Sequence, residues 1–270
     1  YFASTLGSTL YSLLPPKRLL DALPPIFNEK KSLPNSNLKQ NVFVLQCQDE
    51  DRISAYRLII REEFAKGKSV ILIAPTISET IAIYKNIGKG IENYTFLLHQ
   101  RLSKFTIVEI WKKATEERHP IVLVATALFL GLPRSDLGTV IIERESSRIY
   151  KKESRPFTDY RIFAQFLAKH SGARIIRGDS MIESGTFNEL ETGLWQSHDK
   201  TSFRFLTSAK TNTIVFNSET SRKSQSSVSK DVLELIENNR LNSGHLFILS
   251  PRRGLASRTI CRDCGKSLSC

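Results

Sequence analysis

Hydrophobic residues along the chain form short continuous runs, separated by longer stretches in which apolar positions recur at helical spacing. Continuous apolar runs of strand length, rich in Val and Ile, are typical of parallel strands buried on both faces of a sheet. The alternation therefore predicts an α/β fold built on a mainly parallel sheet. The strand-like runs are 41–47, 69–74, 94–98, 121–125, 139–143 and 174–176, and the helix-like stretches are 52–65, 77–87, 105–117 and 159–170.

The same alternation starts again after Trp195. Strand-like runs at 202–206, 212–216 and 245–250, with a helix expected near 229–240, predict the beginning of a second α/β unit. The segment 218–230 is Ser-rich and basic, which is typical of a surface loop.

The domain organisation follows from these patterns. Prolines gather between 15 and 38, which indicates a linker that enters the first α/β domain. Because the chain starts at Tyr1 with no basic leader before an apolar run, we expect an excised piece of a longer protein rather than a signal peptide. The predicted parts are a linker with the end of a preceding domain at 1–37, a first α/β domain at 38–200, the beginning of a second at 201–256 and a cysteine-rich segment at 257–270.

Charge indicates the kind of partner. The 270 residues include 39 Lys and Arg against 27 Asp and Glu, a net charge of +12, which favours an anionic partner through counterion release. A well-solvated basic surface is the alternative. No apolar run approaches the roughly 18 residues of a membrane span, so we do not expect a membrane protein.

Four cysteines are too few and too unevenly spread for a disulfide scaffold. Cys47 stands alone, whereas Cys261 and Cys264 form a Cys-x-x-Cys pair followed by Gly265, with Cys270 close behind. Two thiolates on a tight turn are typical of half a zinc site, so we predict zinc as a cofactor and a reducing cytoplasm as the location. The site is incomplete within this chain because zinc takes four ligands.

Several ordered segments resemble the helicase core of the primosomal protein N′ family: LLHQRLSKFTIVEIWKKA (97–114), IVLVATALF (121–129), the stretch from 137 to 176, and IESGTFNELETGLW (182–195). The tail from Ser250 to Cys270 is similar to that family's Arg-Arg-Gly motif and the start of its zinc module. The resemblance covers nearly the whole chain. It implies two RecA-like domains of a superfamily 2 motor, the second only begun here, which clamp ATP and move along DNA at abandoned replication forks.

The phosphate loop that such a motor needs is altered. Its position, after the first strand-like run, reads QCQDEDRISAY and contains no glycine. Asp49, Glu50 and Asp51 stand in the loop, Arg52 replaces the expected Lys, and Ile53 replaces the hydroxyl that would hold magnesium. Three carboxylates would repel a triphosphate, so binding of ATP and Mg²⁺ is doubtful.

The acidic motif of the family, Asp-Glu-Glu-His, corresponds to Glu143, Arg144, Glu145 and Ser146. Glu143 could still reach a metal ion, but Arg144 replaces the Glu that would orient the attacking water, and a cation cannot accept a proton. The plainer interpretation is that Glu143 and Glu145 form surface ion pairs at a strand end. The segment 177–184 also departs from the family's Gly-Ser-Ala-Thr-Pro run.

Residues suited to DNA follow this motif. An aromatic residue interleaved with cations suits base stacking and phosphate contacts, although such a loop is more often a solvated face. The candidates are Tyr150, Lys151, Lys152, Arg155 and Arg161.

Two further positions come from the resemblance. Arg252 and Arg253 precede Gly254, where the family senses nucleotide; with the phosphate loop altered, contacts to DNA phosphates are equally plausible. His99 is interpreted as a polar residue at a strand end rather than a ligand.

Three functions follow. We favour a DNA-binding relative of the replication restart helicase whose ATPase and helicase activities are lost or strongly reduced, acting on fork or single-stranded DNA with other primosome proteins. The second is an active ATP-dependent 3′–5′ DNA helicase of that family, and the third a non-catalytic protein interaction module. ATP binding separates the first two, and salt-sensitive DNA binding separates the first from the third.

Overall fold

The computed structural model describes residues 41–198 without a break, residues 230–241, and isolated positions at 5, 8, 9, 13, 246, 259–260, 264 and 267–268. The chain divides into two compact units, Tyr1–Phe205 and Leu206–Cys270. The predicted strands at 202–206 and 212–216 lie outside the described residues, as do most of 245–250 and both Arg252 and Arg253.

A seven-stranded sheet forms the centre of the first unit, and every pairing in it is parallel. Its order is β3-β4-β2-β5-β6-β1-β7. The α/β class with a mainly parallel sheet is thus confirmed. The strands are β1 (Val42–Gln46), β2 (Ser69–Ala74), β3 (Thr95–Leu98), β4 (Val122–Thr126), β5 (Leu137–Glu143), β6 (Arg174–Asp179) and β7 (Gln196–Ser197).

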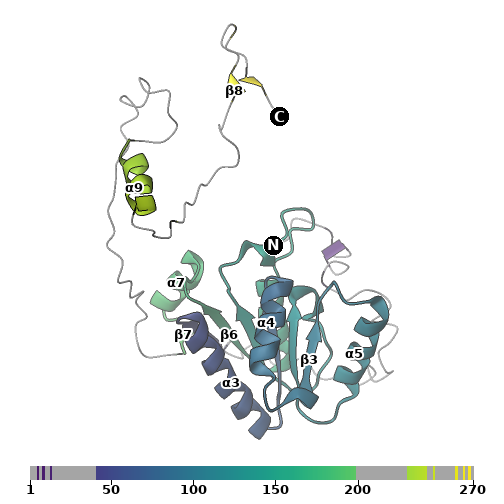
Figure 1. Ribbon diagram of the computed structural model, residues 1–270. Helices are drawn as coiled ribbons and strands as arrows, with labels where there is room; N and C mark the ends of the chain where they lie inside the picture. Colours follow the sequence, from purple (N-terminus) through teal and green to yellow (C-terminus); the bar gives the residue numbers. More distant parts are fainter. Residues whose placement is uncertain are drawn as a thin grey trace. The chain divides into compact units, whose positions relative to one another are not determined.

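Helices cover both faces of this sheet (Figure 1). Helices α3 and α4 pack on one face, and α5 and α6 pack on the other. Each of these four begins and ends within three residues of its predicted stretch, whereas α7 was not predicted. The helices are α3 (Asp49–Ala65), α4 (Ile77–Ile87), α5 (Lys104–Glu116), α6 (Tyr160–Ser171) and α7 (Ser184–Glu191), and the 3₁₀ turns are η2 (Glu92–Tyr94), η3 (Ala127–Phe129) and η4 (Arg148–Tyr150).

Strand β2 shows why the apolar runs are continuous. Ile71 and Ile73 pack toward α5 and α6, whereas Val70 and Leu72 pack toward α3 and α4. All of them are at most 1% exposed. Since burying such a side chain contributes about 1.5–3 kcal/mol, both faces of the strand need apolar residues.

Strand β6 is longer than the apolar run that predicted it. The run ends at Ile176, but the strand continues through Arg177 to Asp179. Both polar side chains are nearly buried, because each has partners at the neighbouring carboxyl end of β5. This polar extension brings charged groups to one edge of the sheet, where parallel α/β folds place their functional sites.

In the second unit, α9 (Lys230–Leu241) confirms the helix predicted near 229–240. Strands β8 (Thr259–Ile260) and β9 (Ser267–Leu268) pair antiparallel. Among the described residues of the whole chain, no helix is both long enough and apolar enough to span a bilayer.

Candidate functional site

Arg52 and Glu143 form a buried ion pair between the start of α3 and the end of β5. Arg52 Nε donates to Glu143 Oε2 over 2.8 Å, and Arg52 Nη2 donates to Oε1 over 2.6 Å. Arg52 also donates to the carbonyl of Cys47, which holds its guanidinium below the helix start. Burial alone would lower the pKa of Arg52, but its hydrogen bonds and the charge of Glu143 raise that pKa above its ordinary value. Arg52 therefore stays protonated.

Tyr56 completes the hydrogen bonding of this carboxylate. Its hydroxyl donates to Glu143 Oε2 over 2.7 Å, one helical turn below Arg52. Burial, then the neighbouring charge of Glu143, raise the pKa of Tyr56 well above its usual value, so the phenol stays protonated. Gly178 lies opposite Glu143 in the adjacent strand, and any Cβ there would collide with the Tyr56 hydroxyl.

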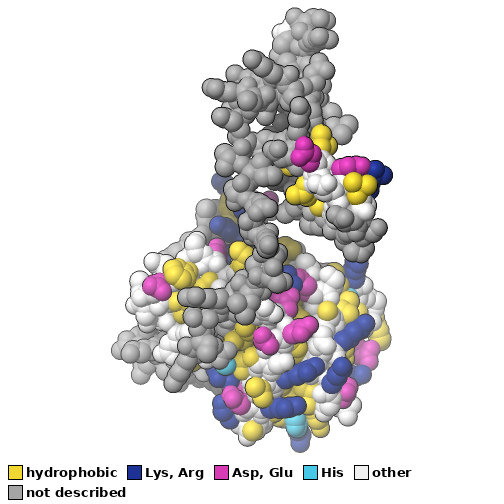
Figure 2. All heavy atoms as spheres, turned by 60° about the vertical axis from the view of Figure 1, so that its left-hand side comes forward, with side chains coloured by type: hydrophobic (Ala, Val, Ile, Leu, Met, Phe, Trp, Pro, Cys, Tyr) yellow, Lys and Arg dark blue, Asp and Glu magenta, His cyan; other side chains and the backbone are white. Residues whose placement is uncertain are grey.

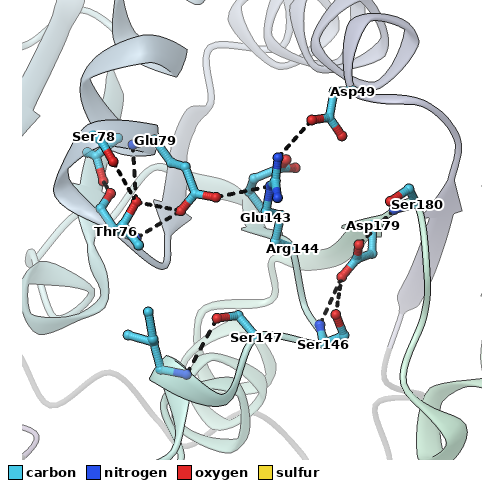
Figure 3. A network of polar contacts seen from close by, with 12 residues as sticks. Asp49, Thr76, Ser78, Glu79, Glu143, Arg144, Ser146, Ser147, Asp179 and Ser180 are labelled. Carbon is cyan, nitrogen blue, oxygen red and sulfur yellow. Dashed lines mark hydrogen bonds and ion pairs between the residues drawn. The ribbon is translucent and has the colours of Figure 1, made fainter. Parts of the chain in front are cut away.

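Arg144 links the beginnings of two helices across the outer side of this pair (Figure 3). Its Nη2 donates to Asp49 at the start of α3 over 2.8 Å, and its Nε lies 3.0 Å from Glu79 in α4. Burial would raise the pKa of Asp49, but Arg52 and Arg144 outweigh it and hold that pKa below its usual value. Glu79 is itself fixed by a capping box with Thr76.

These residues do not fit a magnesium nucleotide. Asp49, Glu50 and Asp51 form the first turn of α3 and place negative charge where the helix amides would otherwise attract phosphate. Both Glu143 oxygens accept hydrogen bonds from Arg52, which leaves the arginine facing a carboxylate instead of phosphate. Four of the predicted replacements therefore lie together and pair with one another: Asp49, Arg52, Glu143 and Arg144.

Glu145 occupies a second buried network. Its Oε1 accepts from the backbone of Glu183 over 2.7 Å, and its Oε2 accepts from Thr186 over 2.9 Å. Arg177 lies 3.4 Å from the same Oε2 and stacks on Trp195, 4.3 Å from the ring centre. The interpretation of Glu143 and Glu145 as surface ion pairs is wrong: they are 4% and 0% exposed, because partners from other elements cover them.

Asp179 anchors the segment 177–184, where the family motif is absent. One carboxylate oxygen accepts from the backbone and hydroxyl of Ser146, and the other accepts from the backbones of Ser180 and Met181 (Figure 3). The turn after β5 is therefore tied to the end of β6 by side-chain bonds.

Two of the predicted DNA contacts are wrong. Tyr150 is fully buried, and its hydroxyl donates to the carbonyl of Glu143 over 2.6 Å and lies 3.1 Å from that of Ile73, so no base can stack on it. Arg161 is 7% exposed and is held by both oxygens of Asp159, by Glu183 and by the Glu145 carbonyl. It orders the protein interior at the start of α6.

The other candidates in this region reach the surface. Lys151 and Arg155 are exposed and Lys152 is partly exposed. Phe157 is 36% exposed beside them, at a left-handed φ of 50° that is uncommon for a residue other than Gly. We call residues 151–157 the basic loop; its accessible aromatic residue is Phe157, which the sequence analysis did not single out.

The predicted metal ligands are only partly described. Cys264 is exposed at a turn between β8 and β9, whereas Cys261 and Cys270 lie outside the described residues. The described part of the chain contains no group of three or more His, Cys, Asp or Glu side chains able to hold a metal. His99 lies buried directly after β3, as predicted for a strand-end residue.

The parallel sheet, covered by helices on both faces, with this charged network at the carboxyl ends of β1, β5 and β6 defines the class: a doubly wound α/β domain with charged residues where such folds place functional sites. Among solved structures, a DEAD box protein from Methanococcus jannaschii has a TM-score of 0.44 at 14% identity, covering 58% of this chain and 44% of that one. RecG, solved with a three-way DNA junction, has a TM-score of 0.39 at 17% identity, covering 58% and 21%.

Over most of its length the chain is similar to curated proteins named replication restart protein PriA. Curated proteins named replication restart protein PriA match 86% of it at 22% identity in Bacillus subtilis and 92% of it at 26% identity in Chlamydia trachomatis. The protein of that name from Chlamydia pneumoniae matches 77% at 29% identity. The chain spans 28–34% of the length of these three relatives. No protein-family model matches it.

Proposed function

We propose that this chain is a DNA-binding, replication-restart protein that has lost ATP hydrolysis. The observation that carries the proposal is the buried, two-bonded pair of Arg52 and Glu143. In the family that the chain resembles, these positions hold the phosphate-binding Lys and the metal-binding acid. Here Arg52 and Glu143 neutralise each other.

The energy of that pair opposes nucleotide binding. A triphosphate and its metal would have to separate Arg52 from Glu143, and breaking a buried pair costs about 3–5 kcal/mol. A penalty of that size lowers affinity by roughly two to four orders of magnitude. Arg144 adds to the effect, because it is held between Asp49 and Glu79 and supplies no group that could orient water.

DNA binding rests on charge and on the basic loop. Lys151, Lys152 and Arg155 suit phosphate contacts, and Phe157 offers a ring to an unstacked base. The proposed ligands are fork or single-stranded DNA, and the proposed setting is the cytoplasm, together with other replication proteins. We also propose that Cys261 and Cys264, with Cys270 and cysteines beyond it, hold zinc.

A nucleotide titration tests the loss of ATPase activity. We expect no saturable binding of a fluorescent ATP analogue to the full-length protein, and no DNA-stimulated phosphate release above a control without protein. Saturable binding of the analogue together with DNA-stimulated phosphate release above that control would contradict the proposal and favour an active ATPase. If the protein does not bind DNA at low salt, the remaining hypothesis is a non-catalytic protein interaction module.

A further inference from the structure

A pocket of about 320 Å³ opens between the second half of α3 and the end of α4. Arg61, on its rim, lies nine residues beyond Arg52, or about 13 Å along the helix axis. The pocket is therefore separate from the Arg52–Glu143 site. Its lining residues are Arg57, Ile60, Arg61, Phe64, Ile87, Lys89 and Ile91.

The floor of this α3–α4 pocket is apolar. Ile60 and Ile87 form its buried base, and Phe64 and Ile91 are only partly covered. Phe64 contacts the ring of His119 edge-on at 5.5 Å, which supports one wall. A hollow with a firm apolar floor suits a bulky apolar side chain from a partner.

The rim of the pocket is positively charged. Arg57 donates through Nε and Nη2 to the carbonyl of Asn86, over 3.1 and 2.7 Å, which fixes its guanidinium in place. Arg61 and Lys89 are exposed. Within the part of the chain that the structure describes, none of these three cations is in an ion pair. Figure 2, which turns the α3 side forward, shows Lys and Arg side chains gathered over the lower part of the domain, with hydrophobic side chains between them.

We propose that the α3–α4 pocket docks an acidic peptide segment of a partner protein, with one apolar side chain in the pocket and carboxylates against Arg57, Arg61 and Lys89. Charge complementarity favours an anionic occupant. The aliphatic base favours a peptide over nucleic acid, because a phosphate backbone gains nothing from burying Ile60 and Ile87. Phe64 is the one aromatic residue in the lining, and its ring is already engaged with His119. The proposal is independent of whether the chain binds DNA or ATP.

Fluorescence anisotropy with short labelled peptides tests the proposal. The probe alternates Glu and Leu, and two matched peptides alternate Gln with Leu or Glu with Ser. We expect saturable binding of the Glu-Leu peptide and at least about tenfold weaker binding of the other two, since both charge and the apolar side chain contribute. In Arg61→Glu combined with Lys89→Glu, affinity for the Glu-Leu peptide should fall by about tenfold or more.

The control variant is Lys104→Glu combined with Lys112→Glu. It makes the same charge change at exposed positions of α5, on the opposite face of the sheet, and should keep the affinity. Equal losses in both variants would overturn the proposal, as would no binding of the Glu-Leu peptide. Displacement of that peptide by single-stranded DNA, with DNA affinity lost only in the pocket variant, would reassign the pocket to nucleic acid.

Discussion

The guanidinium of Arg52 and the carboxylate of Glu143 meet in a two-bonded pair that joins residues 91 positions apart in the sequence. Arg52 is completely buried and Glu143 almost so. Neither group can be removed without leaving the other as an uncompensated charge inside the protein.

Single substitutions at this pair should therefore be costly. Arg52→Ala or Glu143→Ala should each lower the free energy of unfolding by about 3–5 kcal/mol, measured by urea denaturation. Arg52→Met combined with Glu143→Leu should cost less than the two alanine changes together, because no charge is left buried. Lys113→Ala, which breaks an exposed helical pair with Glu109, should cost less than about 0.5 kcal/mol. If the double variant lost as much stability as the two alanine variants summed, Arg52 and Glu143 would not be coupled.

Tyr150 and Phe157 should separate stability from DNA binding. Tyr150→Ala should destabilise the protein by about 3–5 kcal/mol, because it empties a buried site. Phe157→Ala should leave the melting temperature nearly unchanged and weaken single-stranded DNA binding by roughly 1–3 kcal/mol if a base stacks there. Unchanged DNA affinity in Phe157→Ala would remove stacking from the proposal.

DNA binding should be electrostatic and should need no nucleotide. If about 4–6 phosphates are neutralised, the logarithm of the duplex affinity should fall with the logarithm of salt concentration by about 0.9 per contact. Lys151→Ala combined with Lys152→Ala should reduce this slope by up to about 2, and the matched change of Lys104 and Lys112 should leave it unaltered. Affinity that does not depend on salt would argue against phosphate contacts.

Acid should weaken the Asp159–Arg161 pair. Burial would raise the pKa of Asp159, but hydrogen bonds and charge from Arg161 hold it below the usual value. A lowered folded-state pKa adds stability that is complete above the unfolded value of about 3.9 and is lost as the pH falls through the folded value. Urea midpoints at pH 7, 5 and 3 should fall mainly below pH 4. Asp159→Asn should be less stable at pH 7 and lose less on acidification, while Asp51→Asn at an exposed position should follow the unmodified protein.

Zinc binding can be measured on the full-length protein. We expect bound zinc by elemental analysis, with thiolate ligands about 2.3 Å from the ion by X-ray absorption. Cys261→Ser combined with Cys264→Ser should remove at least one equivalent, whereas Cys47→Ser, far away in the sequence, should not. Full zinc content in the double variant would contradict the assignment.

The sheet was predictable because its signal is local. Strand β2 lies at its predicted residues, since each position from Ser69 to Ala74 is buried and the sequence there is almost entirely apolar. Helix α4 also lies at its predicted residues, 77–87, and in the structure Thr76 and Glu79 form a capping box at its start. Such patterns depend on neighbours in the sequence.

The site was only half predictable, because its partners are distant in sequence. Arg52, Glu143 and Arg144 depart visibly from the family motifs in the sequence, but nothing in the sequence shows that Arg52 pairs with Glu143. Tyr150 was misread because an aromatic residue beside two lysines resembles a DNA contact, whereas its ring packs into the core and its hydroxyl meets a carbonyl of β5. Nothing local distinguishes a buried from an accessible ring in such a loop.

Gly178 restricts which substitutions the Arg52–Glu143 site can tolerate during evolution. Tyr56 can reach Glu143 only while residue 178 has no side chain, so a lineage that acquired this tyrosine would be constrained to keep the glycine. Arg52, Tyr56, Glu143 and Gly178 should therefore change together or not at all among descendants. On the proposed function, chains with these four residues in place of a glycine-rich phosphate loop should also lack nucleotide binding.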